Sequence, residues 1–232
     1  DRAALALAER PTTGHTQAFR PGTVRTEPDG RMYSAVFEKN AKPVIDGLSA
    51  FLAGRTGTAL EIGSGTGQHI IAFSQAFPAL TWTPSEPDLI HRASIDAWRA
   101  HSNAPTSRSI SLDAARDWAN SPEILAITPL TLILSLNVIH ISPIGVLHGI
   151  LNGAGKTLGP DGFLGFYGPF TENGAHTGDG NAMFDRRLRA DNPDWGVRDV
   201  DDLRETGAGA GLVFHALLPM PSNNRLLILT KP

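Results

Sequence analysis

Apolar and polar residues follow one another along the chain in blocks that predict strands and helices in alternation. Apolar residues recur at helical spacing between Ala41 and Leu52, and the short apolar run Thr58–Ile62 predicts a buried strand. Leu130–Leu136 reads LTLILSL, which is typical of a central strand that is covered on both faces. Helices are expected over 41–52, 68–77, 88–101, 144–158, about 183–189 and 200–206, and strands over 58–62, 80–83, 109–112, 130–136, 162–167, 211–219 and 225–230.

This order of elements predicts an α/β fold with a seven-stranded, mostly parallel, Rossmann-like sheet and helices on both faces. The last two strands are joined by Met220–Asn224, a length that suits a hairpin, so one C-terminal strand should be antiparallel. Residues 1–30 are rich in proline and glycine and are expected to form a flexible N-terminal arm. Residues 31–232 form the predicted domain, with a lid or substrate insertion at about 168–199.

Composition narrows the classes of function. The net charge is -3 over 232 residues, which gives no reason to expect a nucleic-acid partner. No apolar run is long enough for a membrane span, and without an export signal a cytoplasmic location is expected. The absence of cysteine excludes disulfides and thiolate chemistry, and the eight histidines show no metal-ligand pairing, so no metal is expected. His69, His91 and His101 are expected on the surface, and the sequence sets no oligomeric state.

A glycine-rich loop follows the first buried strand and reads Glu61-Ile-Gly63-Ser64-Gly65-Thr-Gly67, with Gln68 next. Glycines at the carboxyl end of a strand let the backbone turn tightly and approach a ligand. A dinucleotide fingerprint needs Gly-x-Gly-x-x-Gly, but here the third glycine of that pattern is replaced by Gln68. The carboxylate of Glu61 disfavours a pyrophosphate and favours a cationic sulfonium or ammonium. A turn without a ligand is the plainer alternative.

Glu86 stands at the end of the second strand, nineteen positions after Gly67, where a ribose-binding acid is expected. Its carboxylate can accept hydrogen bonds from both ribose hydroxyls. The alternative is an acid that interacts with the dipole of the next helix, although Asp88 is the expected cap of that helix. Asp113 ends the third predicted strand, and a turn or helix-cap role is the alternative for it.

The loop from Glu61 to Gly67 resembles motif I of class I methyltransferases, which use S-adenosylmethionine (SAM) and release S-adenosylhomocysteine. In such enzymes an acid at the position of Asp113 accepts a hydrogen bond from the adenine amino group, and the Ala114 amide would face the ring. The same resemblance implies the seven-stranded fold with its late hairpin.

Several further stretches are similar to one family, the methyltransferase-like protein 26 family, and their order along residues 31 to 232 makes the similarity specific. These stretches are Asn40–Ile45, Glu61–Gln68, Pro84–Asp88, Leu112–Asp113 with Trp118, Asn137–Pro143, Tyr167–Phe170, Phe184–Asp185 with Leu188–Arg189, Asn192–Asp199 and Met220–Asn224. The family usually has Asp where this chain has Glu86. The resemblance implies a cofactor and a fold and names no acceptor.

Four residues near the predicted cofactor site are candidates for binding or chemistry. Asn137, after the fourth strand, could hold the amino-acid end of the cofactor or the substrate, and His140 is the best candidate for a general base. His140 could equally pack in the wall of the site. Tyr33 and Asn40 could fold over the methionine end, where an aromatic face suits a sulfonium, or could be surface residues.

The insertion contributes the candidate substrate residues. They are Tyr167, Phe170, Arg189, Trp195 and Arg198. Two arginines could bind an anionic group, whereas the aromatic residues, Phe184 included, are also what the core of a small subdomain would need.

The sequence therefore predicts SAM-dependent methyl transfer to a small-molecule or peptide acceptor. The alternative from another class is a catalytically silent SAM-binding module that serves as a partner subunit or sensor. A nicotinamide oxidoreductase is a third hypothesis, and Glu61 and Gln68 count against it.

Overall fold

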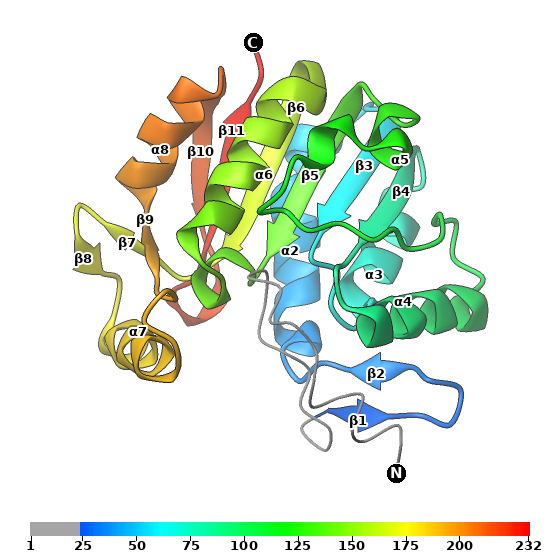
Figure 1. The fold of residues 1–232 in the computed structure, drawn as a ribbon, viewed down its shortest axis with the longest axis horizontal. Coiled ribbons are helices and arrows are strands. Elements are labelled where there is room, and N and C mark those ends of the chain that lie inside the picture. Colours follow the sequence, from blue (N-terminus) through cyan, green and yellow to red (C-terminus); the bar gives the residue numbers. More distant parts are fainter. Residues whose placement is uncertain (1–23) are drawn as a thin grey trace.

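The computed structural model describes residues 24–232 and shows a central sheet with helices on both faces (Figure 1). The α-helices are α2 (Phe37–Leu52), α3 (Gln68–Ala76), α4 (Leu89–Ser102), α5 (Pro122–Leu125), α6 (Ile144–Thr157), α7 (Asp179–Asp191) and α8 (Val200–Gly209). Short 3₁₀ helices are η1 (Trp118–Asn120), η2 (Ile139–Ile141) and η3 (Pro221–Asn223). The strands are β1 (Arg25–Thr26), β2 (Met32–Tyr33), β3 (Gly57–Ile62), β4 (Leu80–Ser85), β5 (Leu130–Leu136), β6 (Leu158–Gly168), β7 (Phe170–Glu172), β8 (Ala175–His176), β9 (Arg198–Asp199), β10 (Val213–Pro219) and β11 (Arg225–Thr230).

Most of the predicted N-terminal arm, residues 1–23, lies outside the described residues. Its remainder, residues 24–30, provides β1 and the turn into β2, and the two strands pair antiparallel. Structure therefore begins before residue 31, the expected start of the domain.

The central sheet has six strands in the order β10-β11-β6-β5-β3-β4. Neighbours among β6, β5, β3 and β4 are parallel, while β11 is antiparallel to both β6 and β10. The predicted hairpin and its single antiparallel strand are thus confirmed. The predicted number of strands is wrong, because the sheet has six strands and not seven.

The missing strand is the one expected over Ser109–Leu112. This segment runs beside β4 but makes only isolated bridges to it, such as Ser85 with Ile110. Pro84 of β4 has no N–H to donate, and the N–H of Ser109 turns to the Asp96 carboxylate of α4 at 2.9 Å. A continuous ladder therefore cannot form, although the apolar pattern had suggested one.

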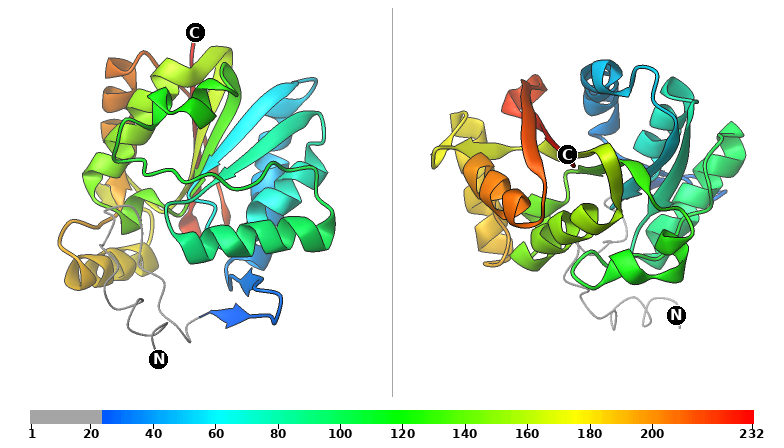
Figure 2. Two further views of the ribbon diagram at one scale, coloured as in Figure 1. Left: turned by 45° about the vertical axis from the view of Figure 1, so that its right-hand side comes forward. Right: turned by 90° about the horizontal axis from the view of Figure 1, so that it is seen from above.

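Alternation of side chains along the strands divides the core into two layers. Leu60 of β3 packs in a cluster with residues of α6 and α8, whereas its neighbour Ala59 packs in a second cluster with residues of α2 and α3. The right-hand view of Figure 2 shows α6 and α8 on one face of the sheet and α2 and α3 on the other. Such a sheet is buried on both faces, which is why β5 is almost wholly apolar.

The insertion at 168–199 folds as a small unit beside the end of β6. Its strands form a three-stranded sheet in the order β8-β7-β9, next to α7 (Figure 1). Phe170 and Leu188 are buried there. Phe170 belongs to the same core cluster as Phe166, so the insertion packs against the main core.

Candidate functional site

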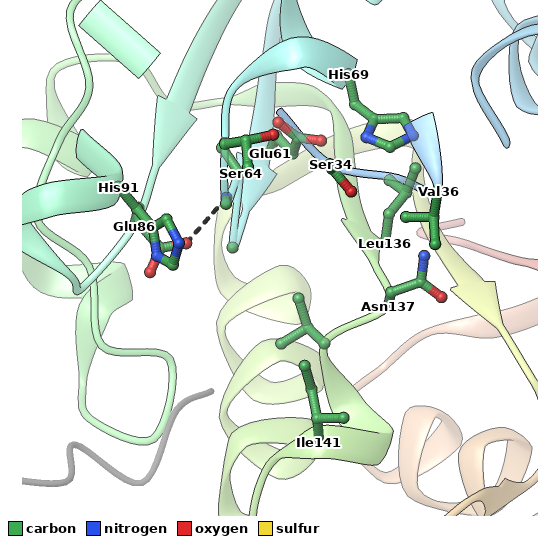
Figure 3. A pocket seen from close by; sticks show the side chains of 14 residues that line it. Ser34, Val36, Glu61, Ser64, His69, Glu86, His91, Leu136, Asn137 and Ile141 are labelled. Carbon is green, nitrogen blue, oxygen red and sulfur yellow. Dashed lines mark hydrogen bonds between the residues drawn. The ribbon is translucent and has the colours of Figure 1, made fainter. Parts of the chain in front are cut away.

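The parallel strands β3, β4 and β5 end at the same edge of the sheet, and β3 lies between the other two. In open α/β sheets, ligands bind at this edge where the strand order reverses. A cavity of about 280 Å³ lies there (Figure 3). Its lining residues are Ser34, Val36, Glu61, Gly63, Ser64, Gly65, Thr66, His69, Glu86, His91, Leu136, Asn137, Val138 and Ile141.

The glycine loop forms the floor of this cavity between β3 and α3. Gly63, Gly65 and Gly67 all have positive φ angles (77°, 53° and 94°), which side chains with a Cβ rarely adopt. The N–H groups of Gly63 and Ser64 both donate to the carbonyl of Ser85, so the loop is tied to the end of β4. A Cβ on Gly67 would lie 2.7 Å from the Cα of Ile95, so this glycine lets α3 approach α4 closely. The positive φ angles therefore explain why glycine occurs at positions 63, 65 and 67.

Glu61 is the most unusual group in the cavity because its carboxylate is buried. The residue is 1% exposed, and its Oε2 has no hydrogen-bond partner among residues 24–232. Burial raises the pKa of Glu61 to about 8; a hydrogen bond with Ser64 opposes this rise, and the nearby Glu86 adds to it. Buried polar groups are normally paired. An unpaired carboxylate oxygen in a cavity is therefore suited to a ligand that donates hydrogen bonds and carries positive charge.

Glu86 follows β4 and faces the same cavity. Its Oε2 accepts from the Gly65 N–H at 3.0 Å, and its Oε1 accepts from the Asp88 N–H at 3.2 Å. Burial raises the pKa of Glu86 to about 7, although these two backbone hydrogen bonds oppose the rise. Each oxygen can accept a further hydrogen bond, because a carboxylate has about four acceptor positions. Asp88 caps α4, as predicted, by accepting from the N–H groups of Ile90 and His91.

Two histidines that were expected on the surface line the cavity instead. His69 is in the first turn of α3, and His91 is in the first turn of α4. Both helices begin at the carboxyl edge of the sheet, so their first turns face the ligand space. Sequence spacing alone does not reveal this, because the position of a histidine in a first turn does not show which way its side chain faces. Of the three histidines expected on the surface, His101 is exposed.

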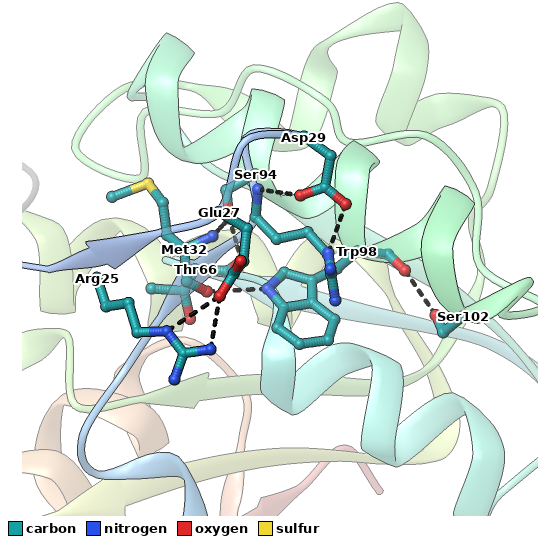
Figure 4. A network of polar contacts seen from close by, with 9 residues as sticks. Arg25, Glu27, Asp29, Met32, Thr66, Ser94, Trp98 and Ser102 are labelled. Carbon is teal, nitrogen blue, oxygen red and sulfur yellow. Dashed lines mark hydrogen bonds and ion pairs between the residues drawn. The ribbon is translucent and has the colours of Figure 1, made fainter.

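A buried serine connects the N-terminal hairpin to the glycine loop. The hydroxyl of Ser94 accepts from the Met32 N–H at 2.8 Å and donates to the Thr66 carbonyl at 2.7 Å (Figure 4). Trp98, one turn further along α4, donates its indole N–H to the Met32 carbonyl. The hairpin, α4 and one wall of the cavity are therefore held as a unit.

Replacing Ser94 by Ala should lower the free energy of unfolding by about 1–3 kcal/mol, because the buried N–H of Met32 would lose its acceptor. Ser102→Ala is the matched control, since the Ser102 hydroxyl bonds only within α4, to the Trp98 carbonyl (Figure 4). The control should stay within about 0.5 kcal/mol of the parent. Denaturant unfolding measures both, and equal losses would contradict the bridging role of Ser94.

Other predicted cofactor residues lie next to the cavity without lining it. Gln68 accepts the N–H of Ser34 on its Oε1 at 2.6 Å and so fixes the segment that enters α2. Asn40 is buried and accepts from the hydroxyl of Tyr167 at 2.8 Å. The ring of Tyr33 packs against Trp98 rather than into the cavity. Direct cofactor contacts of Tyr33, Asn40 and Gln68 stay predictions.

Asp113 and Ala114 lie outside the cavity lining. The Asp113 carboxylate accepts from the Ala115 N–H at 3.0 Å and pairs with Arg116 at 3.2 Å. Ala114 is buried against Gly149 of α6. Asp113 therefore has the turn role that was the alternative for it, and the contact of Asp113 and Ala114 with adenine stays a prediction.

Asn137 lines the cavity, whereas His140 lies behind it. Asn137 follows β5 with a φ of 56°, and its N–H donates to the Tyr167 carbonyl. His140 is buried, packs edge-on against Phe184 with ring centroids 5.6 Å apart, and approaches Gly168. Burial and the nearby Arg198 lower the pKa of His140 to about 4. Its role as a base stays a prediction.

The five predicted substrate residues do not face this cavity. Tyr167 and Phe170 are buried, and Trp195 is partly buried. Arg198 donates to the carbonyls of Ile139, Ser142 and Asp194, so its guanidinium joins the insertion to η2. Arg189 and Arg198 line a separate hollow of about 580 Å³ together with four aspartates, which offset the positive charge.

Neither a metal site nor a membrane-spanning helix is found within residues 24–232. No group of three or more His, Asp or Glu residues there is arranged to hold a metal ion. No helix in the described part of the chain combines the length and apolarity that a membrane span needs.

Comparison with solved structures shows that the fold is similar to the folds of several methyltransferases. A putative O-methyltransferase from Nostoc punctiforme PCC 73102 has a TM-score of 0.70 at 15% identity, covering 85% of this chain and 58% of that one. An O-methyltransferase family 2 protein from Planctomyces limnophilus DSM 3776, in complex with apigenin, has a TM-score of 0.68 at 19% identity (83% and 56%). An O-methyltransferase from neocarzinostatin biosynthesis, in complex with SAM and 2-hydroxy-5-methyl naphthoic acid, has a TM-score of 0.64 at 14% identity (84% and 54%). These identities show the fold alone, and the chain spans just over half the length of the three proteins.

The chain belongs to the family described as a protein of unknown function (DUF938), whose profile matches residues 31–231. That description names no activity. The resemblance to the methyltransferase-like protein 26 family stays a prediction.

Proposed function

We propose that this chain binds SAM at the carboxyl edge of β3, β4 and β5 and transfers its methyl group to a small-molecule acceptor. The observation that carries the proposal is the buried, unpaired carboxylate oxygen of Glu61 in the cavity. SAM carries an ammonium group and a sulfonium, and either cation lowers the cost of keeping that carboxylate charged. The methyltransferase fold supports the same conclusion.

Different residues of the cavity are proposed to bind different parts of the cofactor. Glu61 would accept from the ammonium group, and Glu86, with one acceptor position left on each oxygen, would accept from the ribose hydroxyls. The glycine loop has no side chains at Gly63, Gly65 and Gly67, so its backbone can come close to the ligand. Asp113 and Ala114 are proposed for the adenine end. When bound, SAM supplies an electrophilic methyl group on a sulfonium sulfur.

A nicotinamide dinucleotide fits this cavity poorly. Burial raises the pKa of Glu61 to about 8 and that of Glu86 to about 7, and a pyrophosphate supplies no positive charge that would offset the cost of their charged forms. Gln68, which replaces the glycine of the dinucleotide pattern, is already engaged with the Ser34 N–H. The cavity therefore favours a cationic cofactor.

A small organic acceptor is the proposed substrate class. The solved structures named above contain apigenin and a naphthoic acid, both small molecules. Val36, Leu136 and Ile141 contribute apolar side chains to the lining, as is usual in small-molecule sites. Methyl transfer needs the acceptor aligned with the methyl group.

Calorimetric titration with SAM, S-adenosylhomocysteine and NAD tests the cofactor. We expect saturable binding of the first two and none of NAD. A folded protein that binds neither SAM nor its product contradicts the proposal. Consumption of methyl-labelled SAM with a library of small acceptors then tests catalysis, and binding without turnover of any acceptor would favour a silent SAM-binding module.

A further inference from the structure

The two ring nitrogens of His69 have different surroundings. The imidazole packs edge-on against Phe37, with ring centroids 5.1 Å apart, and lies 5.9 Å from the ring of Phe73. Nε2 is enclosed and has no hydrogen-bond partner among residues 24–232, so Nδ1 is the nitrogen left open to the cavity. Burial lowers the pKa of His69 to about 4, so the ring is neutral at pH 7 and carries one proton. A proton on Nδ1 leaves only an acceptor unpaired, and buried unpaired acceptors are commoner in proteins than buried unpaired N–H groups.

Ser34 adds a second neutral donor to the same end of the cavity. Its backbone N–H donates to Oε1 of Gln68 at 2.6 Å, and this hydrogen bond fixes Ser34 at the cavity wall. Figure 3 shows Ser34 between Glu61 and His69 in the lining. A serine hydroxyl can rotate to donate to whichever acceptor a ligand presents.

The position of these two donors indicates which part of the cofactor they meet. Figure 3 shows Glu86 and His91 on one side of the cavity, Glu61 in the middle, and Ser34 and His69 further along. If Glu86 binds the ribose and Glu61 binds the ammonium group, the carboxylate on the same carbon as the ammonium lies beyond Glu61. Of the residues between 24 and 232 that line the cavity, none is lysine or arginine, so that carboxylate needs neutral donors.

The start of α3 supplies positive potential in place of a cationic side chain. The helix begins at Gln68, and no side chain caps its first turn. The N–H groups at the start of a helix have no partner within the helix, and their partial positive charge favours a carboxylate. His69 belongs to this first turn, so its Nδ1–H and the helix start can act on the same group.

We propose that Ser34 and His69 bind the carboxylate of the amino-acid part of SAM through two neutral donors, the Ser34 hydroxyl and the His69 Nδ1–H, and that Gln68 is the residue that positions Ser34. The inference rests on the proposed function and adds recognition of the anionic end of the cofactor. Glu61 binds the ammonium and these donors bind the carboxylate, so the cavity selects a zwitterion. Holding both groups also fixes the direction of the methyl group on the sulfonium.

Two product analogues separate the carboxylate from the rest of the cofactor. Calorimetry on the parent protein compares S-adenosylhomocysteine with its decarboxylated analogue, which keeps the adenosine, the thioether and the ammonium group. The analogue should bind about 10-fold more weakly or worse, because hydrogen bonds to a charged group are lost. Equal or tighter binding of the analogue overturns the proposal, and this comparison needs no variant.

Variants at three positions assign the contact. Ser34→Ala and His69→Phe should each weaken S-adenosylhomocysteine binding by about 10-fold, while affinity for the decarboxylated analogue changes by less than about threefold. His69→Asn keeps an N–H donor near the position of Nδ1 and should recover most of the loss. Gln68→Ala should weaken S-adenosylhomocysteine binding, and adding Ser34→Ala should cost little more, because both act through one hydroxyl.

The matched histidine control for these variants is His148→Asn, on the exposed face of α6. It should bind both ligands as the parent does. Affinities for the two ligands that fall equally in Ser34→Ala and His69→Phe, or that do not fall at all, contradict the assignment.

Histidine side-chain NMR on the parent protein tests the His69 contact directly. In protein labelled with ¹⁵N-histidine, Nδ1 of His69 should resonate as a protonated nitrogen. It should shift on saturation with S-adenosylhomocysteine and shift much less with the decarboxylated analogue. His69→Phe identifies the resonance by its loss. An unprotonated Nδ1, or an equal shift with both ligands, overturns the role given to His69.

Binding by the parent distinguishes failure of this inference from failure of the proposed function. If the parent binds neither SAM nor S-adenosylhomocysteine, the proposed function fails. If it binds both but does not discriminate against the decarboxylated analogue, the inference about Ser34 and His69 fails alone.

Discussion

Glu61→Gln should weaken SAM binding by about 100-fold and at the same time stabilise the cofactor-free protein at alkaline pH. The loss corresponds to about 2.7 kcal/mol, within the range for losing one partner of a charged hydrogen bond. The new amide would also direct N–H groups toward the ammonium of the ligand. Calorimetric titration of both proteins with SAM at pH 8 measures the change.

The gain in stability follows from the direction of the pKa shift. Burial raises the pKa of Glu61 to about 8, whereas in the unfolded chain it is close to 4.5. Between these pH values the folded protein holds a proton that the unfolded chain has released, so the free energy of unfolding falls as the pH rises. A shift of this size corresponds to roughly 3–5 kcal/mol at pH 8 and above. Glu61→Gln removes this cost, so its advantage over the parent should be small at pH 5 and large at pH 8.5.

The same linkage predicts how SAM binding depends on pH. The ammonium group needs the charged form of Glu61, so binding should release a proton, and affinity should increase from pH 6 to pH 8. Titrations in buffers of different ionisation enthalpy detect that proton. Glu205→Gln, an exposed acid on α8, is the control and should follow the parent in both measurements. Parent-like SAM affinity in Glu61→Gln would refute the role given to this carboxylate.

Gly149→Ala should destabilise the protein by about 2–4 kcal/mol, although alanine is the better helix former. A Cβ at Gly149 would lie 1.7 Å from the carbonyl oxygen of Ala114, which is a backbone atom and cannot rotate away. The segment that carries Ala114 would have to move away from α6. The indole N–H of Trp118 donates to the Gly149 carbonyl at 2.9 Å, so that hydrogen bond would be strained as well.

Gly145→Ala provides the matched control in the same helix. A Cβ at Gly145 meets no atom of the described residues within 4 Å, so this substitution should be neutral or slightly stabilising. Thermal melts should show a decrease of roughly 5–10 °C for Gly149→Ala and little change for Gly145→Ala. Similar melting temperatures for the two variants would contradict this prediction, because α6 and the segment that carries Ala114 could then move apart at little cost in free energy.

Local sequence patterns predicted most of the fold because its strands and helices are buried in regular ways. The helical periodicity of α2 and the apolar run of β5 each reflect a face, or two faces, packed in the core. The glycine loop was predictable because φ angles such as the 77° of Gly63 and the 94° of Gly67 favour one residue type. The extra strand at 109–112 was wrong because the bonding of Pro84 and Asp96 depends on neighbours that are distant in the sequence.

The sequence by itself determined the α/β layering, the glycine loop after β3 and the presence of acids at the ends of β3 and β4, because these follow from periodicity, backbone angles and spacing. Only the tertiary structure decided which side chains face the cavity. It brings His69 and Asn137 to the wall, removes His140 and Arg198 from it, and leaves a carboxylate oxygen of Glu61 without a partner among the described residues. Orientation and burial depend on contacts between distant segments, and a linear pattern does not contain those contacts.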